Sequence, residues 1–134
     1  MKAAVRVLDS YSLIAYLEGG EGADKMIEIF KSARDSGRSL LLPVVNWGKV
    51  YHITLREAGR ERTEEIAHLI STLSIQMIPA DLELTKGAAE FKASKKMSYA
   101  DCFAAALAKL RRSELVTGDE EFKQVEGEVK ILWI

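Results

Sequence analysis

Three aspartates stand where short apolar runs end or helical patterns begin. Asp9 directly follows the apolar run Ala4–Leu8, and Asp119 follows the run Leu115–Thr117 after one glycine. Asp101 lies in the first turn of an Ala- and Leu-rich helical pattern. Taken singly, an aspartate at such a position caps a helix by accepting a backbone N–H. Taken together, the three carboxylates would converge on one edge of a parallel sheet, because strand ends and helix starts meet there.

Three converging carboxylates form a set of oxygen ligands. Carboxylates packed together repel one another and resist ionisation. A hard divalent cation relieves that cost, and Mg²⁺ and Mn²⁺ prefer oxygen ligands while leaving positions for water and substrate phosphate. The chemistry predicted for such a site is metal-assisted hydrolysis of a phosphodiester, in which one ion activates a water and a second stabilises the leaving oxygen about 4 Å away.

The elements that must position these aspartates alternate between short apolar runs and helical patterns. The predicted strands are Ala4–Leu8, Leu40–Val44, Ile75–Ile78, Leu115–Thr117 and Val129–Trp133. Helical periodicity lies between them, most clearly over Met26–Ala33, Ile66–Leu73 and Ser98–Arg112. Strands that alternate with helices predict right-handed crossovers and a parallel sheet covered on both faces. The predicted fold class is therefore α/β, with a central, mainly parallel sheet of about five strands.

Length and composition predict one domain spanning 1–134. Hydrophobic residues make up 48% and charged residues 29% of the 134 residues, and the net charge of -1 excludes a strongly basic nucleic-acid coat. Cys102 is the single cysteine, which excludes an internal disulfide and a cysteine-rich zinc site. No apolar stretch approaches the roughly 20 residues of a membrane span, and the start does not resemble a signal peptide. We expect a cytoplasmic protein without a membrane segment.

Other catalytic motifs are missing from the sequence. It contains no P-loop, no G-x-G-x-x-G after a strand and no G-x-S-x-G elbow. His52 and His68 do not have the H-E-x-x-H spacing, and Cys102 lies in an apolar helical pattern where a small core residue is expected. The acidic positions thus remain the candidates for chemistry.

Three ordered motifs resemble those of one known family. The segments are Leu8–Leu17 (LDSYSLIAYL), Ser98–Ala108 (SYADCFAAALA) and Leu115–Phe122 (LVTGDEEF). They resemble PIN-domain ribonucleases, particularly the toxin subunits of VapBC toxin–antitoxin systems. The resemblance implies a three-layer α/β/α sandwich and a Mg²⁺- or Mn²⁺-dependent cleavage of single-stranded RNA, with Asp9, Asp101 and Asp119 as catalytic and metal-binding residues. It also implies a cognate antitoxin partner and a homodimer.

The second acidic motif of that family departs from the pattern here. The family has a glutamate where the stretch Val45–Tyr51 has Lys49. Asn46 is predicted to cap this helix, so Lys49 would lie in its first turn and oppose the helix dipole by about 0.3–1 kcal/mol. Either the side chain turns to solvent, or its ammonium enters the acidic crevice and pairs with an aspartate in place of a metal ion. The second interpretation is preferred because clustered carboxylates attract a cation.

Supporting residues follow from the same arrangement. The hydroxyls of Ser12 and Thr117 are predicted to orient a carboxylate or a metal-bound water, although Thr117 also suits a strand as a β-branched residue. Lys92, Lys95 and Lys96 precede the acidic edge. A solvated loop is the preferred interpretation of these lysines, and contact with RNA phosphates is the alternative. The carboxylates of Glu120 and Glu121 beside Asp119 are expected in solvent, with compensation for the missing glutamate as the alternative.

The sequence therefore supports two functions. The first is a metal-dependent endonuclease of single-stranded RNA, impaired by Lys49. The second is a catalytically inactive binding module that keeps the fold and binds an antitoxin or RNA.

Overall fold

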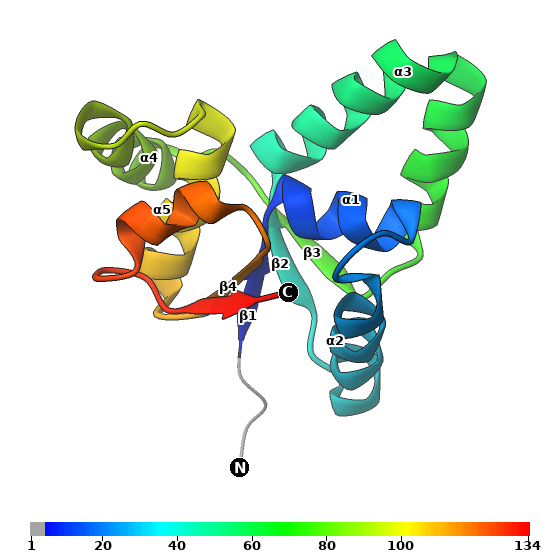
Figure 1. Cartoon of the computed structure of the whole chain (residues 1–134), viewed down its shortest axis with the longest axis horizontal. Helices are drawn as coiled ribbons and strands as arrows, with labels where there is room; N and C mark the ends of the chain where they lie inside the picture. The colour runs from blue at the N-terminus through cyan, green and yellow to red at the C-terminus, as the bar shows by residue number, and fades with distance from the viewer. Residues whose placement is uncertain (1–4) are drawn as a thin grey trace.

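A five-stranded parallel sheet forms the centre of the computed structural model, which describes residues 5–134 (Figure 1). The strand order is β3-β2-β1-β4-β5, and each neighbouring pair is parallel. The strands are β1 (Arg6–Leu8), β2 (Leu40–Pro43), β3 (Ile75–Ile78), β4 (Glu114–Thr117) and β5 (Ile131–Trp133). Because β1 is the middle strand, with β2 and β4 on its two sides, residues that follow β1 and β4 are neighbours in space.

Helices cover both faces of the sheet and give the predicted three layers. They are α1 (Ser10–Glu18), α2 (Ala23–Ser36), α3 (Val44–Ser71), α4 (Leu82–Ser94) and α5 (Tyr99–Arg111), and a 3₁₀ helix η1 (Glu120–Val125) precedes β5. In Figure 1, α1, α2 and α3 lie on one side of the sheet, and α4 and α5 lie on the other.

Alternating residues of the strands pack into two separate hydrophobic cores, one on each face of the sheet. Val7 and Leu115 belong to the core under α4 and α5, whereas Leu8 and Val116 belong to the core under α1, α2 and α3. Successive side chains of a strand point to opposite faces of a sheet, so a continuous apolar run is needed when both faces are covered. The runs in the sequence therefore predicted this burial correctly.

Several predicted boundaries were wrong by one or two residues. Val44 belongs to α3 rather than to β2, since the strand ends at Pro43. Val129 lies before β5, because its N–H bonds the Val125 carbonyl in the turn that ends η1. The predicted start of the first strand at Ala4 lies outside the described residues, and β1 begins at Arg6. Ser98 and Arg112 are caps of α5 rather than its first and last residues.

The long helix α3 is divided by Gly59 into two arms (Figure 1). Gly59 has φ 83° and ψ 174°, a backbone conformation that favours glycine. The Tyr51 hydroxyl donates to Glu64 Oε1 at 2.5 Å, which joins the two arms across the kink. The first of the two arms carries Lys49.

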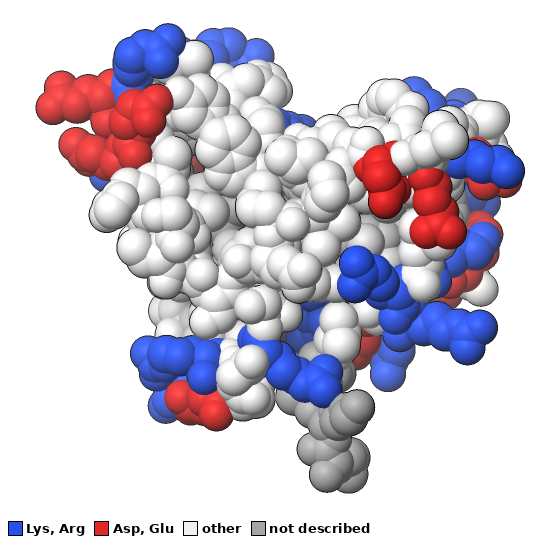
Figure 2. Space-filling view, turned by 180° about the vertical axis from the view of Figure 1, so that it is seen from behind, with Lys and Arg blue, Asp and Glu red and all other residues white. Residues whose placement is uncertain are grey.

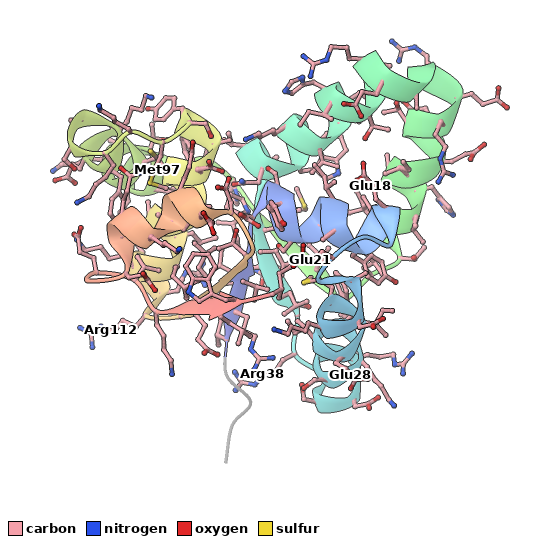
Figure 3. All side chains as sticks on the ribbon, in the orientation of Figure 1. Glu18, Glu21, Glu28, Arg38, Met97 and Arg112 are labelled. Atoms are coloured by element: carbon pink, nitrogen blue, oxygen red, sulfur yellow. The ribbon has the colours of Figure 1, made fainter. Side chains whose placement is uncertain are left out.

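The two ends of the sheet differ in charge. Basic side chains gather along the lower rim of the molecule in Figure 2, and Figure 3 shows Arg38 and Arg112 at the end where the strands begin. Asp9 and Asp119 follow the opposite, carboxyl ends of β1 and β4. Among the described residues, no helix is long and apolar enough to cross a membrane.

Candidate metal centre at the carboxyl edge of the sheet

Two of the predicted aspartates cap helices and stand at the same edge of the sheet. Asp9 follows β1 and caps α1, where its Oδ1 accepts the Ser12 N–H at 2.8 Å. Asp119 follows β4 and caps η1, where its Oδ1 accepts the Glu121 N–H at 3.0 Å. Asp101 lies in the first turn of α5 and is not the cap; Ser98 caps this helix by accepting the Asp101 N–H at 3.2 Å. Asp9 and Asp119 can therefore cap helices and also belong to the candidate site.

Asp9 is a fully buried carboxyl group. Burial raises the pKa of Asp9 from 3.8 to about 7, although hydrogen bonds from Thr117 and Ser12 lower it. The charge of Asp101 adds a smaller increase to the pKa of Asp9, which places the two carboxylates within electrostatic reach of each other.

Thr117 connects two of the aspartates through one hydroxyl. Its Oγ1 donates to Asp9 Oδ2 at 2.6 Å and accepts the Asp119 N–H at 3.0 Å. Ser12 holds Asp9 from the other side, since its own hydroxyl accepts the Asp9 N–H at 3.2 Å. Both hydroxyls predicted to support the site therefore contact Asp9 atoms.

The carboxylates that lie closest together differ from the predicted set. One ligand oxygen each from Asp101, Asp119 and Glu121 lie within 4.8 Å of one another, and Asp9 is outside this group. Glu121 is exposed at the surface, as expected, yet its carboxylate reaches the two aspartates. The sequence indicated this closeness only through the two-residue spacing of Glu121 from Asp119. The tight 3₁₀ turn of η1 brings residues at this spacing close together.

Lys49 places its ammonium beside Asp101, one member of this acidic group. Its Nζ lies 3.9 Å from Asp101 Oδ1 and 3.4 Å from Ser98 Oγ. Burial raises the pKa of Asp101, and the positive charge of Lys49 opposes that increase. Of the two orientations considered for this side chain, the structure has the one that pairs with an aspartate.

The predicted cap of α3 was wrong. The helix begins at Val44 after Pro43, so Asn46 lies inside the first turn and Lys49 lies beyond it. Pro43 is the N-cap, with φ −61° and ψ 137°, and it has no side-chain oxygen that could cap the helix. The penalty expected from a lysine in the first turn therefore does not apply. Asn46 is instead buried against α1, where its Nδ2 donates to Ser10 Oγ at 3.1 Å.

The three lysines considered as RNA contacts have different surroundings. Lys92 Nζ donates to the Met97 carbonyl at 2.8 Å, and Lys95 Nζ lies 3.8 Å from Glu128 Oε2. Lys96 is exposed. The first two ammonium groups thus have partners within the chain, and an RNA contact by these lysines stays a prediction.

The chemistry of the donor set suits a hard divalent ion. The carboxylates of Asp101, Asp119 and Glu121 offer oxygen atoms only, which Mg²⁺ and Mn²⁺ prefer over nitrogen and sulfur ligands. Lys49 supplies a competing positive charge at Asp101. An ion would therefore find suitable ligands but would have to displace the ammonium from its partner.

Solved structures of VapBC complexes share this fold. The chain resembles VapBC2 from Rickettsia felis, bound to a promoter DNA fragment, with a TM-score of 0.77, 10% identity, and coverage of 96% of this chain and 97% of that one. DNA-bound VapBC from Salmonella typhimurium gives a TM-score of 0.75, 17% identity, and coverage of 97% and 98%. VapC20 from Mycobacterium tuberculosis, a toxin that cleaves the sarcin–ricin loop, gives 0.73, 13% identity, and coverage of 93% and 97%.

Sequence comparison gives the family. No curated protein matches the chain. A family model of the PIN domain matches residues 6–128. This range includes the three aspartates and the strands β1 to β4. On this match and the shared fold, the chain belongs to the PIN domain family.

Proposed function

We propose that this chain is a metal-dependent endonuclease of single-stranded RNA, of the toxin–antitoxin type, whose activity is impaired by Lys49. The observation that carries the proposal is the contact between Lys49 and Asp101 at 3.9 Å. It puts a positive charge of the chain itself at an acidic group whose composition suits a metal ion.

The residues proposed to hold the ion, Mg²⁺ or Mn²⁺, are Asp101 and Asp119, and Asp9 stays a proposed ligand outside the closest group. Glu121 joins this set because its carboxylate lies within 4.8 Å of the other two. A bound ion would supply charge neutralisation at the phosphodiester and activation of a water.

The chain's own residues prepare the edge for that chemistry. Thr117 fixes the carboxylate of Asp9 and the backbone N–H of Asp119 with one hydroxyl, which sets their relative position. Lys49 lowers the free energy of the ionised Asp101 without any metal, since a cation stabilises a neighbouring carboxylate. An ion that binds must therefore compete with Lys49 for Asp101, and its affinity falls accordingly.

Support for the biological context comes from the structural neighbours. These include VapBC complexes and the gonococcal FitAcB structure, in addition to the toxin that cleaves the sarcin–ricin loop. We infer that this chain also has a protein antitoxin as partner and forms a homodimer.

A groove offers one place for such a partner. Its cavity of about 280 Å³ lies between α2, the end of α1 and the end of α3, and it is lined by Tyr16, Ile27, Phe30, Lys31, Arg34, Thr72, Leu73 and Ser74. Apolar residues with Lys31 and Arg34 at the rim would suit a segment that carries both apolar and acidic side chains. Ile27 is half exposed, so its replacement by aspartate should weaken a cognate antitoxin complex without disturbing the core.

Cleavage of single-stranded RNA by the Lys49→Glu variant tests the proposed activity. The variant restores the family's acidic residue and should cleave RNA in Mn²⁺ but not in EDTA, whereas the original chain should cleave far more slowly. Lys86→Glu is the matched control, because it makes the same charge change at an exposed position of α4. Cleavage that appears equally in both variants would contradict the proposal.

The second candidate is an inactive binding module. The Lys49–Asp101 pair favours it as well, because a site neutralised from within needs no metal to be stable. If Lys49→Glu gains no cleavage although the folded variant binds RNA or an antitoxin, this second function replaces the first.

A further inference from the structure

An exposed tyrosine covers the turn that leads to Asp119. Tyr11 lies in the first turn of α1, two residues after Asp9, and 40% of it is exposed. Its ring lies against Gly118, the residue between Thr117 and Asp119. Tyr11 therefore connects the two chain segments that carry Asp9 and Asp119.

The ring occupies space that only a glycine leaves free. A Cβ atom on Gly118 would lie 2.4 Å from Cε1 and 2.9 Å from Cζ of Tyr11, which is too close for carbon atoms that are not bonded to each other. Gly118 itself needs no left-handed backbone, since it is not among the glycines with positive φ. An alanine at this position would therefore require the Tyr11 ring to move.

The tyrosine hydroxyl has no partner within the described part of the chain. Of the hydrogen bonds formed there, none involves Tyr11 Oη, whereas Tyr51 donates to Glu64. A partly exposed ring with a free hydroxyl offers both a face for stacking and a polar group for hydrogen bonding.

Charge determines which part of an RNA strand this edge can bind. Asp101, Asp119 and Glu121 repel phosphate, and Lys49 already pairs with Asp101. Without a metal ion, affinity here has to come from uncharged contacts. Stacking of a base on an aromatic ring is such a contact, and every base has a face that can stack.

We propose that Tyr11 is the base-stacking residue of this edge, which holds one nucleobase of a single-stranded RNA beside Asp9 and Asp119. The inference rests on the proposed RNA-binding function and adds the residue that positions the strand. Tyr11 touches a base rather than the reacting phosphate, so it is a positioning residue.

The experiment measures binding of fluorescent oligoadenylate, and of an abasic strand of equal length, by anisotropy in EDTA. EDTA removes metal-dependent binding and cleavage from the measurement. Tyr11→Leu keeps apolar bulk but loses the aromatic face, and it should weaken oligoadenylate binding about 5- to 150-fold. Tyr11→Phe should stay within about threefold of the original chain. The abasic strand should bind weakly to all of these proteins.

Tyr99 provides the matched control. It is 46% exposed and lies in the first turn of α5, but it packs on Phe103 with a centroid distance of 5.2 Å. Residues two apart on a helix point in nearly opposite directions, so Tyr99 faces away from Asp101. Tyr99→Leu should therefore leave oligoadenylate binding unchanged.

A second variant displaces the ring without removing it. Gly118→Ala forces Tyr11 off the turn and should weaken binding in the same direction as Tyr11→Leu. This variant keeps the test decisive if Tyr11→Leu fails to fold.

Each other outcome contradicts the inference in a distinguishable way. If the original chain binds oligoadenylate and neither Tyr11→Leu nor Gly118→Ala weakens it, Tyr11 is not the stacking residue, and the proposed function survives. If neither the original chain nor Lys49→Glu binds RNA, the inference and the proposed function both fall. If Tyr11→Leu changes the mass measured by light scattering but not RNA binding, the ring belongs to a protein interface.

Discussion

Lys49 and Asp101 form an ion pair, 3.9 Å from Nζ to Oδ1, at the edge of the sheet where the acidic residues gather. Asp101 is almost fully buried and Lys49 partly so, which weakens screening by water. Removing one partner of such a pair costs more than the pair itself contributes, because the remaining charge loses its counterion. The pair thus accounts for a stable acidic edge without an ion, and the proposed impairment of activity rests on this pair.

The raised pKa of Asp9 predicts a pH-dependent stability. The unfolded chain releases this proton near pH 4 and the folded chain near pH 7, so the folded state binds more protons between these values. The contribution of Asp9 to the free energy of unfolding therefore falls as pH rises from about 4 to about 7, by about 4 kcal/mol at most.

Asp9→Asn removes this titration, so the free energy of unfolding of the variant should fall less steeply as pH rises. Its amide oxygen can still accept the Ser12 N–H, so the variant should be more stable than the original chain at pH 8 and should lose that advantage at pH 5. Urea unfolding at both pH values measures the difference. A variant that is equally destabilised at both would show that Asp9 is ionised in the folded protein throughout this range.

Thr117 is predicted to stabilise the edge through its hydroxyl. Thr117→Val keeps the shape but removes the hydrogen bonds to Asp9 and Asp119, and the buried Asp9 loses its closest donor. We expect a loss of about 1–3 kcal/mol in the free energy of unfolding. Thr117→Ser retains the hydroxyl and should lose less. The hydroxyl would be unimportant if the serine variant proved less stable than the valine variant.

Two glycines of α3 predict opposite responses to alanine. Gly59 has φ 83° with no atom within 4 Å of an added Cβ, so Gly59→Ala is strained by its backbone alone and should cost about 1–3 kcal/mol. Gly48 has helical backbone and equally open space, so Gly48→Ala should gain up to about 1 kcal/mol. Thermal unfolding of both variants measures this contrast. Equal shifts would mean that the kink at Gly59 is not fixed in solution.

The sequence predicted the architecture well because both faces of the sheet are covered. Continuous apolar runs such as Leu40–Leu42 are typical of strands buried on both sides. Together with shorter or interrupted apolar runs, they identified all five strands. Helix α4 was not predicted, although Leu84, Ala88 and Phe91 have helical spacing. Its first residue, Leu82, is highly exposed, which blurs the division into an apolar and a polar face.

The site was predicted less completely, for reasons of side-chain reach. Placement at strand ends and helix starts located Asp9, Asp101 and Asp119 on one edge, because backbone topology determines those positions. Which carboxylates lie closest depends on side-chain direction, and this brought in Glu121 and left Asp9 outside the closest group. The attraction of a cation to clustered carboxylates predicted that Lys49 pairs with an aspartate, and the structure identifies Asp101 as its partner.

Calorimetric titration with Mn²⁺ tests the role of Lys49 most directly. The original chain should bind Mn²⁺ weakly or not at all, and Lys49→Glu should bind it much more tightly. Lys49→Met, which removes the ammonium without adding a ligand, should give intermediate affinity because Asp101 is freed. Equal Mn²⁺ affinity in all three proteins would contradict the account, since it would show that the ammonium of Lys49 does not compete for the acidic edge.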